Sequence, residues 1–122
     1  MPQISVDYSS SLAGTFDRRA LGLAINRLAE ETIDAKPGSC RTVFRQSEEL
    51  VVGSTGPAGD AQVYVEFQVF PGRTPEAKAA LGEGVVALLA RHVRPLPGAR
   101  LFTAVNIADI DRGSYRNGTV QG

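Results

Sequence analysis

The sequence begins with Met-Pro-Gln-Ile-Ser-Val-Asp-Tyr over residues 1–8, and the whole fold can be developed from this stretch. Ile4, Val6 and Tyr8 alternate with polar residues, which is the period-two pattern of a half-buried β-strand. Because proline is small, the initiator methionine before it is normally removed, and Pro2 then carries a free secondary amine. A strand that starts at the terminus holds this amine inside the fold. We therefore predict that the amine of Pro2 is a catalytic base.

The composition indicates one small domain. The chain has 122 residues, of which 43% are hydrophobic, and its 13 basic residues balance 13 acidic ones, so no basic excess argues for nucleic acid. The lone cysteine, Cys40, excludes an internal disulfide framework and fits a reducing compartment. The sequence shows no signal-peptide pattern and no apolar run of membrane-spanning length. We expect a cytoplasmic protein with neither a nucleic-acid nor a membrane partner.

The first half of the chain has a strand–helix–strand pattern. After the opening strand, apolar residues at helical spacing predict an amphipathic helix over residues 16–32, which Thr15 would cap. A strand rich in valine and phenylalanine follows over residues 41–52. A glycine-rich linker, residues 53–59, then leads to the second half.

The second half repeats this pattern. Residues 62–69 alternate between apolar and polar, and Thr74-Pro75-Glu76 is a strong helix start, with a cap, a proline in first position and an acid in the first turn. A fourth strand is predicted over residues 101–107, and a tail over residues 111–122 contains turn signals. A shift of 59 residues along the sequence places Thr15 on Thr74, so the repeat is one of architecture.

Two such units predict an α+β fold in one domain, residues 1–122, with repeat halves over about residues 2–52 and 60–110. Each crossover should be right-handed and join parallel strands, which gives a four-stranded mixed sheet with both helices on one face. The other face stays uncovered and should carry Tyr64, Phe70 and polar residues. An uncovered face of this kind predicts a homo-oligomer.

Three features together resemble the tautomerase superfamily, and in particular its 5-carboxymethyl-2-hydroxymuconate isomerase branch. They are the opening octapeptide, the double β-α-β plan, and Phe-Pro-Gly-Arg-Thr-Pro-Glu over residues 70–76. The resemblance covers residues 2 to about 110. It implies a trimer with an amino-terminal proline at each active site, which isomerises a dicarboxylated or tricarboxylated enol of aromatic-acid breakdown without a cofactor or a metal.

The resemblance also implies which residues form the site. Pro2 matches the catalytic proline, Arg41 matches an arginine after the first helix, and Arg73 matches an arginine before the second helix. Arg45 shares a strand side with Arg41 and is a weaker, substrate-binding candidate. The sequence departs from the pattern at Gln3, where many relatives have histidine, and in its glycine-rich linker.

These residue types suit a proton shift between two positions of an enol. An α-amino group has a pKa of about 7.7 to 8.0, and burial and nearby cations lower it, so the amine of Pro2 can be an uncharged base at neutral pH. An arginine binds a carboxylate with two parallel hydrogen bonds and can also stabilise charge that develops on a dienolate oxygen. The residues alone leave the two roles unassigned between Arg41 and Arg73.

Two alternatives stay open. A proline-dependent enzyme of the same fold could act on another unsaturated acid, by phenylpyruvate-like tautomerisation, hydration or dehalogenation. A trimeric binding protein without catalytic activity could also use this fold, because a fold does not fix a function. Retention of Met1 would favour the binding protein, since Pro2 would then be an amide and no base.

Overall fold

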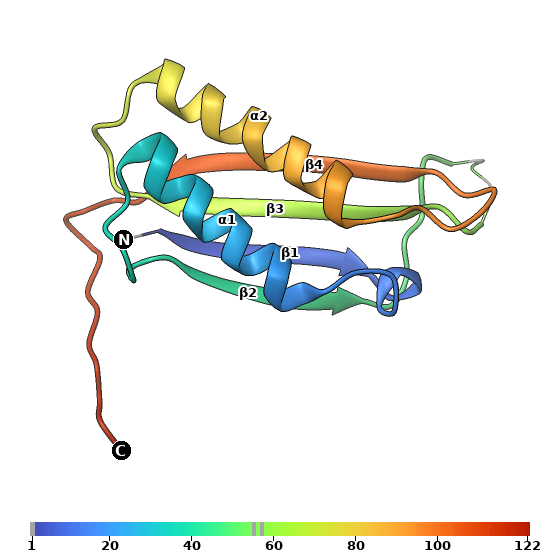
Figure 1. Ribbon diagram of the computed structural model, residues 1–122, viewed down its shortest axis with the longest axis horizontal. Coiled ribbons are helices and arrows are strands. Elements are labelled where there is room, and N and C mark those ends of the chain that lie inside the picture. Colours follow the sequence, from blue (N-terminus) through green and yellow to red (C-terminus); the bar gives the residue numbers. More distant parts are fainter. Residues whose placement is uncertain (1, 55, 57) are drawn as a thin grey trace.

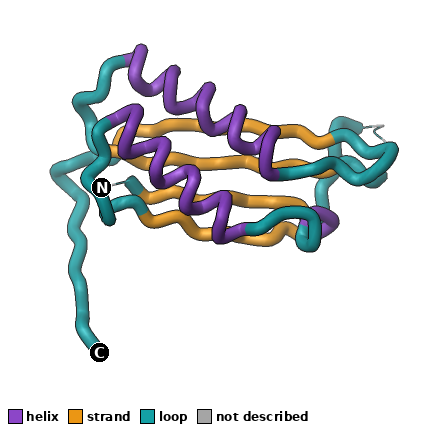
Figure 2. Tube along the Cα trace, in the orientation of Figure 1, coloured by secondary structure: helices purple, strands orange, loops and turns teal. Residues whose placement is uncertain are grey.

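The computed structural model describes residues 2–54, 56 and 58–122, and Figures 1 and 2 show its two layers. Four strands form one sheet, and two long helices lie side by side across one of its faces. In chain order the elements are β1 (Gln3–Ser9), a short 3-10 turn η1 (Ser10–Leu12), α1 (Arg18–Ile33), β2 (Arg41–Ser47), β3 (Ala61–Val69), α2 (Pro75–His92) and β4 (Leu101–Asp109).

The strand order is β2-β1-β3-β4, and the two central strands come from different halves of the chain. β1 is parallel to β2, β3 is parallel to β4, and β1 and β3 are antiparallel, with Val6 opposite Val65. This arrangement confirms the predicted α+β fold, with its four-stranded mixed sheet and both helices on one face.

The core lies between the sheet and the helices. Alternate residues of the central strands point into it, because successive side chains of a strand face opposite sides of a sheet. The helices contribute a stripe of fully buried side chains, and each buried leucine or isoleucine contributes roughly 1.5–3 kcal/mol. The fully buried core residues include Ile4, Val6, Val63, Val65, Phe67, Leu21, Ile25, Leu81, Val85 and Leu89.

The structure corrects the predicted start of the first helix. Thr15 does not cap it, because its hydroxyl donates to the carbonyl of Leu12 at 2.8 Å and so closes the turn after η1. Asp17 is the cap instead: its side chain accepts from the backbone N–H of Ala20 at 3.0 Å. The predicted cap of α2 is confirmed, since Thr74 accepts from Ala77 in the same way.

The second strand ends at Ser47, five residues before the predicted end at residue 52. Ser47 pairs with Ser9, the last residue of β1, so residues 48–52 have no neighbouring strand to bond. β4 is longer than predicted, because it pairs with β3 as far as Val69 opposite Asp109. The predicted linker, residues 53–59, includes residues 55 and 57, which lie outside the described residues.

None of the helices in the described part of the chain is both long and apolar enough to span a membrane.

Candidate functional site

One end of the sheet, here called the Pro2 end, collects the predicted site residues Pro2, Arg41 and Arg73. β1 and β2 begin at this end, β3 and β4 finish there, and α1 ends and α2 begins above it (Figure 1). Pro2 is buried, and its carbonyl accepts a hydrogen bond of 3.2 Å from the backbone N–H of Arg41. Pro2 is therefore tied to the sheet, as the opening strand predicted.

Arg73 ties two elements together at this end. Its Nε donates to the carbonyl of Ile33, the last residue of α1, at 3.3 Å, and its Nη1 donates to the carbonyl of Phe70 at 3.1 Å. The carbonyl end of a helix is its negative end, so a guanidinium is favourable there. Gly72, with φ +116°, makes the turn that brings Arg73 back. The half-buried guanidinium thus holds a fixed positive charge at the Pro2 end.

Cys40 lies beside these groups and is half-buried. Burial raises the pKa of its thiol, and the charge of Glu30 acts in the same direction, while Arg73 opposes them. The thiol is therefore neutral at pH 7 and acts as a small packed side chain.

Arg41 and Arg45 lie on the open face of the sheet, which the helices do not cover. Arg41 is opposite Gln3 and is exposed. Arg45 is four residues further along β2, where its Nη1 is 4.0 Å from the carboxylate of Asp7. It lines a shallow hollow of about 330 Å³ in the middle of the open face, together with Tyr64 and other residues. The structure therefore brings Arg41 to the Pro2 end but places Arg45 away from it.

The tail adds two residues to this end that the sequence analysis did not select. Ile110 donates its backbone N–H to the carbonyl of Val69, and the chain then turns. The guanidinium carbon of Arg112 lies 4.2 Å from the centre of the Phe70 ring, and the ring of Tyr115 meets Phe70 edge-on at 5.2 Å. The Arg112-Gly113 turn signal was visible in the sequence, but its packing on Phe70 was not.

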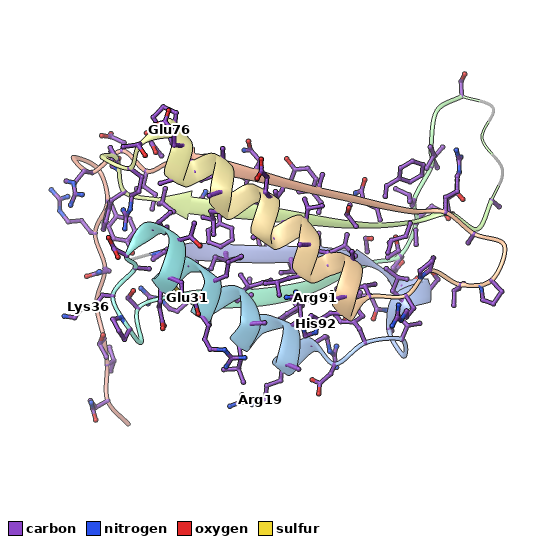
Figure 3. The ribbon with its side chains drawn as sticks, turned by 45° about the horizontal axis from the view of Figure 1, so that its top comes forward. Arg19, Glu31, Lys36, Glu76, Arg91 and His92 are labelled. Atoms are coloured by element: carbon purple, nitrogen blue, oxygen red, sulfur yellow. The ribbon has the colours of Figure 1, made fainter. Side chains whose placement is uncertain are left out.

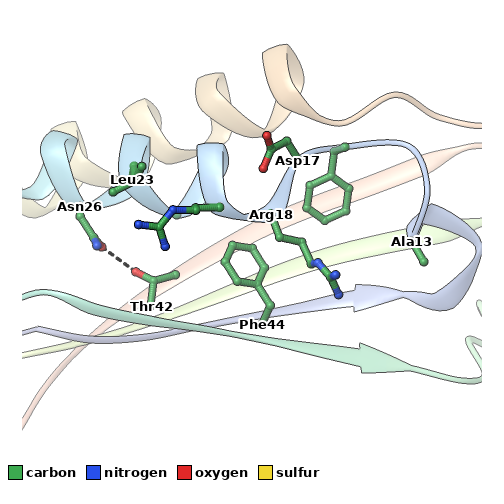
Figure 4. Close-up of a pocket in the computed structure, with 10 residues that line it drawn as sticks. Ala13, Asp17, Arg18, Leu23, Asn26, Thr42 and Phe44 are labelled. Carbon is green, nitrogen blue, oxygen red and sulfur yellow. Dashed lines mark hydrogen bonds between the residues drawn. The ribbon is translucent and has the colours of Figure 1, made fainter.

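A larger groove lies elsewhere, between α1 and β2 (Figure 4). Its volume is about 620 Å³, its aromatic walls are Phe16 and Phe44, and the hydrogen bond from Thr42 to Asn26, 2.6 Å long, crosses one end. None of the four predicted site residues lines it. His92 is also remote, at the far end of α2 from Pro2 (Figure 3).

The described residues form no group of three or more histidine, cysteine, aspartate or glutamate side chains that could hold a metal ion. The charge at the Pro2 end comes from arginines instead. Guanidinium groups can bind carboxylates and stabilise an oxyanion through hydrogen bonds.

Solved structures share this fold, although no protein-family model matches the sequence and no curated protein is significantly similar to it. A 5-carboxymethyl-2-hydroxymuconate isomerase from Deinococcus radiodurans R1 superposes with a TM-score of 0.80 at 18% identity, over 98% of this chain and 90% of that one. A 5-carboxymethyl-2-hydroxymuconate delta-isomerase gives 0.77 at 18% identity, over 98% and 89%.

A malonate semialdehyde decarboxylase, which also has hydratase activity, gives a TM-score of 0.67 at 16% identity, over 98% of this chain and 92% of that one. These proteins belong to the tautomerase superfamily and catalyse different reactions, so what they share with this chain is the architecture. The resemblance drawn from the sequence is confirmed at that level: the chain has the tautomerase fold.

Proposed function

We propose that the protein is a cofactor-independent isomerase that moves a proton within a carboxylated enol or dienol, with the amine of Pro2 as the proton carrier. The observation that carries this proposal is the position of Pro2: it is buried at the start of a central strand, with Arg41 and Arg73 at the same end of the sheet. Met1 lies outside the described residues, and its removal is part of the proposal.

The amine of Pro2 would act first as a base and then as an acid. Uncharged, it accepts a proton from the substrate and leaves a dienolate; as an ammonium, it returns the proton at the second carbon. The uncharged form of a buried amine near arginines is favoured, because burial and the positive charge of the arginines both disfavour the ammonium form. The rigid ring also fixes the direction of the nitrogen lone pair.

The two arginines suit different tasks. Arg73 is held by two backbone carbonyls, so its guanidinium stays in place as charge develops, which suits stabilisation of the dienolate oxygen. Its Nη2 takes no part in those two bonds and can face the substrate. Arg41 begins β2 at the same end of the sheet, and its guanidinium suits the binding of a carboxylate.

A homo-oligomer, a trimer by resemblance, would complete the site. The open face carries Val43, 39% exposed, and Phe102, 38% exposed, beside polar residues. Apolar side chains on an uncovered sheet face favour burial against another copy of the chain.

The first test pairs an intact-mass measurement with a proline variant. The purified protein should lack Met1, and Pro2→Ala should lose about 10²–10⁴-fold in rate on a 2-hydroxymuconate, the usual contribution of a general acid–base. Pro97→Ala, an exposed loop change at the opposite end of the sheet, is the matched control and should keep its activity. Retained methionine with full activity, or an active Pro2→Ala, would exclude the mechanism.

The second candidate is a hydratase or decarboxylase of unsaturated or oxo acids, which the malonate semialdehyde decarboxylase of the same fold supports. Such chemistry would use the protonated amine, so the rate would fall as pH rises through the pKa of Pro2. The isomerase needs the uncharged amine first, so its rate should rise instead. A pH profile on both substrate types separates the two activities.

A further inference from the structure

The groove between α1 and β2 lies on the helix-covered side of the sheet. Thr42 and Phe44 of β2 line it, whereas Arg41 and Arg45 alternate with them along the strand and face the open side. Its volume of about 620 Å³ falls within the range of pockets that hold small ligands, roughly 300–1,000 Å³. The groove is therefore a candidate binding site that shares no residue with the proposed active site.

Two phenylalanine rings form the apolar walls of the groove, and the fold holds both in place. Phe16 meets the ring of the buried Tyr8 edge-on at 5.3 Å, and its centre lies 6.5 Å from that of Phe44. Gly22 of α1 faces Phe44, because a Cβ on this glycine would lie only 3.2 Å from the ring. Glycine thus lets the ring lie against the helix backbone, at the cost of helix propensity. Leu23, which is 44% exposed, adds a further apolar side chain to the lining.

The polar groups of the groove are mostly hydrogen-bond donors. Arg18 reaches from α1 toward the sheet (Figure 4), where its Nη1 donates to the hydroxyl of Tyr8 at 2.9 Å. Arg19 also lines the groove, and its side chain has no hydrogen bond or ion pair within the described part of the chain. The oxygen of the Asn26 amide accepts from Thr42, which leaves the amide nitrogen as a donor. This excess of donors favours a ligand that carries acceptor oxygens.

The charged side chains that line the groove favour a negative ligand. Arg18 and Arg19 supply two positive charges, and Asp17 supplies one negative charge. The carboxylate of Asp17 already accepts from the backbone N–H of Ala20 as the cap of α1. A guanidinium binds an oxyanion through charge-assisted hydrogen bonds, and its planar fork fits two oxygens of the same group. The groove therefore combines aromatic walls with an unpaired cation, Arg19.

We infer that this groove is a binding site for a small aromatic anion, a planar ring that carries one oxyanionic group. The ring packs against Phe16, Phe44 and Leu23, and the oxyanion binds the guanidinium of Arg19. Aromatic rings pack favourably edge-on or offset against one another, which suits walls that the fold already holds in place. The inference goes beyond the proposed function and does not depend on it, because the site needs neither Pro2 nor a reaction.

The test titrates isotope-labelled protein with three probes and follows the backbone amides by NMR. Naphthalenesulfonate carries both the ring and the charge, naphthalenemethanol carries the ring alone, and ethanesulfonate carries the charge alone. Naphthalenesulfonate should shift the amides of Leu23 and Phe44 and leave that of Phe70, at the Pro2 end, unmoved. It should bind about 10-fold more tightly than either of the other probes, since each lacks one of the two contacts.

Substitutions of exposed residues of α1 separate the two contacts. Arg19→Gln should weaken naphthalenesulfonate about 10-fold and leave naphthalenemethanol unchanged, and Arg19→Lys should weaken naphthalenesulfonate by less. Leu23→Gln should weaken both probes that carry a ring. Arg27→Gln is the matched control, because this exposed arginine lies about two turns further along α1 and does not line the groove. Thermal melting checks that each variant is folded.

Three results would overturn the site. They are amides of Leu23 and Phe44 that do not move in wild type, which is also the result if a second copy of the chain covers the groove; equal binding of naphthalenesulfonate and naphthalenemethanol; and unchanged naphthalenesulfonate binding in Arg19→Gln. Pro2→Ala should bind naphthalenesulfonate as wild type does. Failure of the proline mechanism would therefore leave this site intact, and failure of the site would leave the mechanism intact.

Discussion

The backbone N–H of Arg41 donates to the carbonyl of Pro2 at 3.2 Å, so the edge strand β2 holds the first described residue of the chain in place. The same bond fixes the start of β2, which carries the Arg41 side chain on the open face. One hydrogen bond therefore joins the backbone of the proposed base to the backbone of one of its proposed carboxylate-binding partners.

Arg73 should matter for stability as well as for activity, while Arg41 should matter chiefly for activity. Arg73→Gln leaves the half-buried carbonyls of Ile33 and Phe70 without their charged donor, which should lower the free energy of unfolding by about 1–3 kcal/mol. Arg41→Gln changes an exposed side chain and should cost less. Urea unfolding and steady-state kinetics on both variants test this pair; equal stability losses would contradict it.

The cap of α1 should be Asp17 in solution. Asp17→Ala removes the acceptor for the N–H of Ala20 and should cost about 1 kcal/mol. Thr74→Ala at the start of α2 removes an equivalent bond and should cost a similar amount, so it is the matched control. Chemical denaturation measures the stability of both variants. An Asp17→Ala variant as stable as wild type would show that another residue caps α1.

Asp34, at the end of α1, has a φ of +53° and so lies in the left-handed region of backbone conformation. A residue other than glycine is strained there. Asp34→Gly should therefore raise the free energy of unfolding by up to about 1 kcal/mol, helped by removal of a negative charge from the negative end of the helix. Asp34→Ala keeps the strain and should gain less. A thermal melt in which the alanine variant is the more stable would refute this account.

Two glycines of α2 should respond oppositely to alanine. A Cβ on Gly82 would lie 3.6 Å from Val105, an ordinary contact, so Gly82→Ala should stabilise by about 0.5–1 kcal/mol through helix propensity. A Cβ on Gly84 would lie 2.8 Å from Leu28 of α1, so the leucine must move. The gain in stability from Gly84→Ala should then be cancelled or reversed. In a chain that also carries Leu28→Ala, Gly84→Ala should again be stabilising.

Acid should weaken the start of β3 and β4 through Asp60. The Oδ2 of Asp60 lies 2.7 Å from Nη2 of Arg100, and these hydrogen bonds hold the pKa of the carboxyl below its usual 3.8. A lowered pKa in the folded state means that the carboxylate stabilises the fold above pH 3.8 and loses this contribution as pH falls through its lowered pKa.

Melting of wild type and Asp60→Asn at pH 6 and pH 2 measures that contribution. The variant should be the less stable protein at pH 6, and the difference should shrink at pH 2. A difference that is unchanged or grows in acid would show that the ion pair is not its source.

The fold was largely predictable from the sequence because its signals are local. Alternation marks both central strands, and the threonine–proline–glutamate start marks α2. The errors have a common origin: the end of β2 depends on where β1 leaves the sheet, and Thr15 does not cap α1 because its hydroxyl is bonded in the turn after η1. Both are tertiary facts that no local pattern contains.

The site was less predictable, and the repeat shows why. The 59-residue shift that places Thr15 on Thr74 also places Arg41 on Arg100. In the second half Asp60 binds Arg100, whereas the corresponding position of the first half is Met1. The sequence did not reveal that Arg100 serves an ion pair with Asp60. The tail was harder still, because the Phe70–Arg112 contact joins segments that have no pattern in common.

The antiparallel pairing of β1 with β3 is where the two halves of the sheet join, through residues such as Val6 and Val65. Each half otherwise completes its own parallel pair, and the connection between Ser47 and Ala61 lies at the opposite end of the sheet from Pro2. The protein should therefore be divisible: two fragments made separately, cut within that connection, are expected to reassemble along this seam with the Pro2 end undisturbed. Such a split form would allow Pro2 and Arg73 to be altered and recombined on independent pieces.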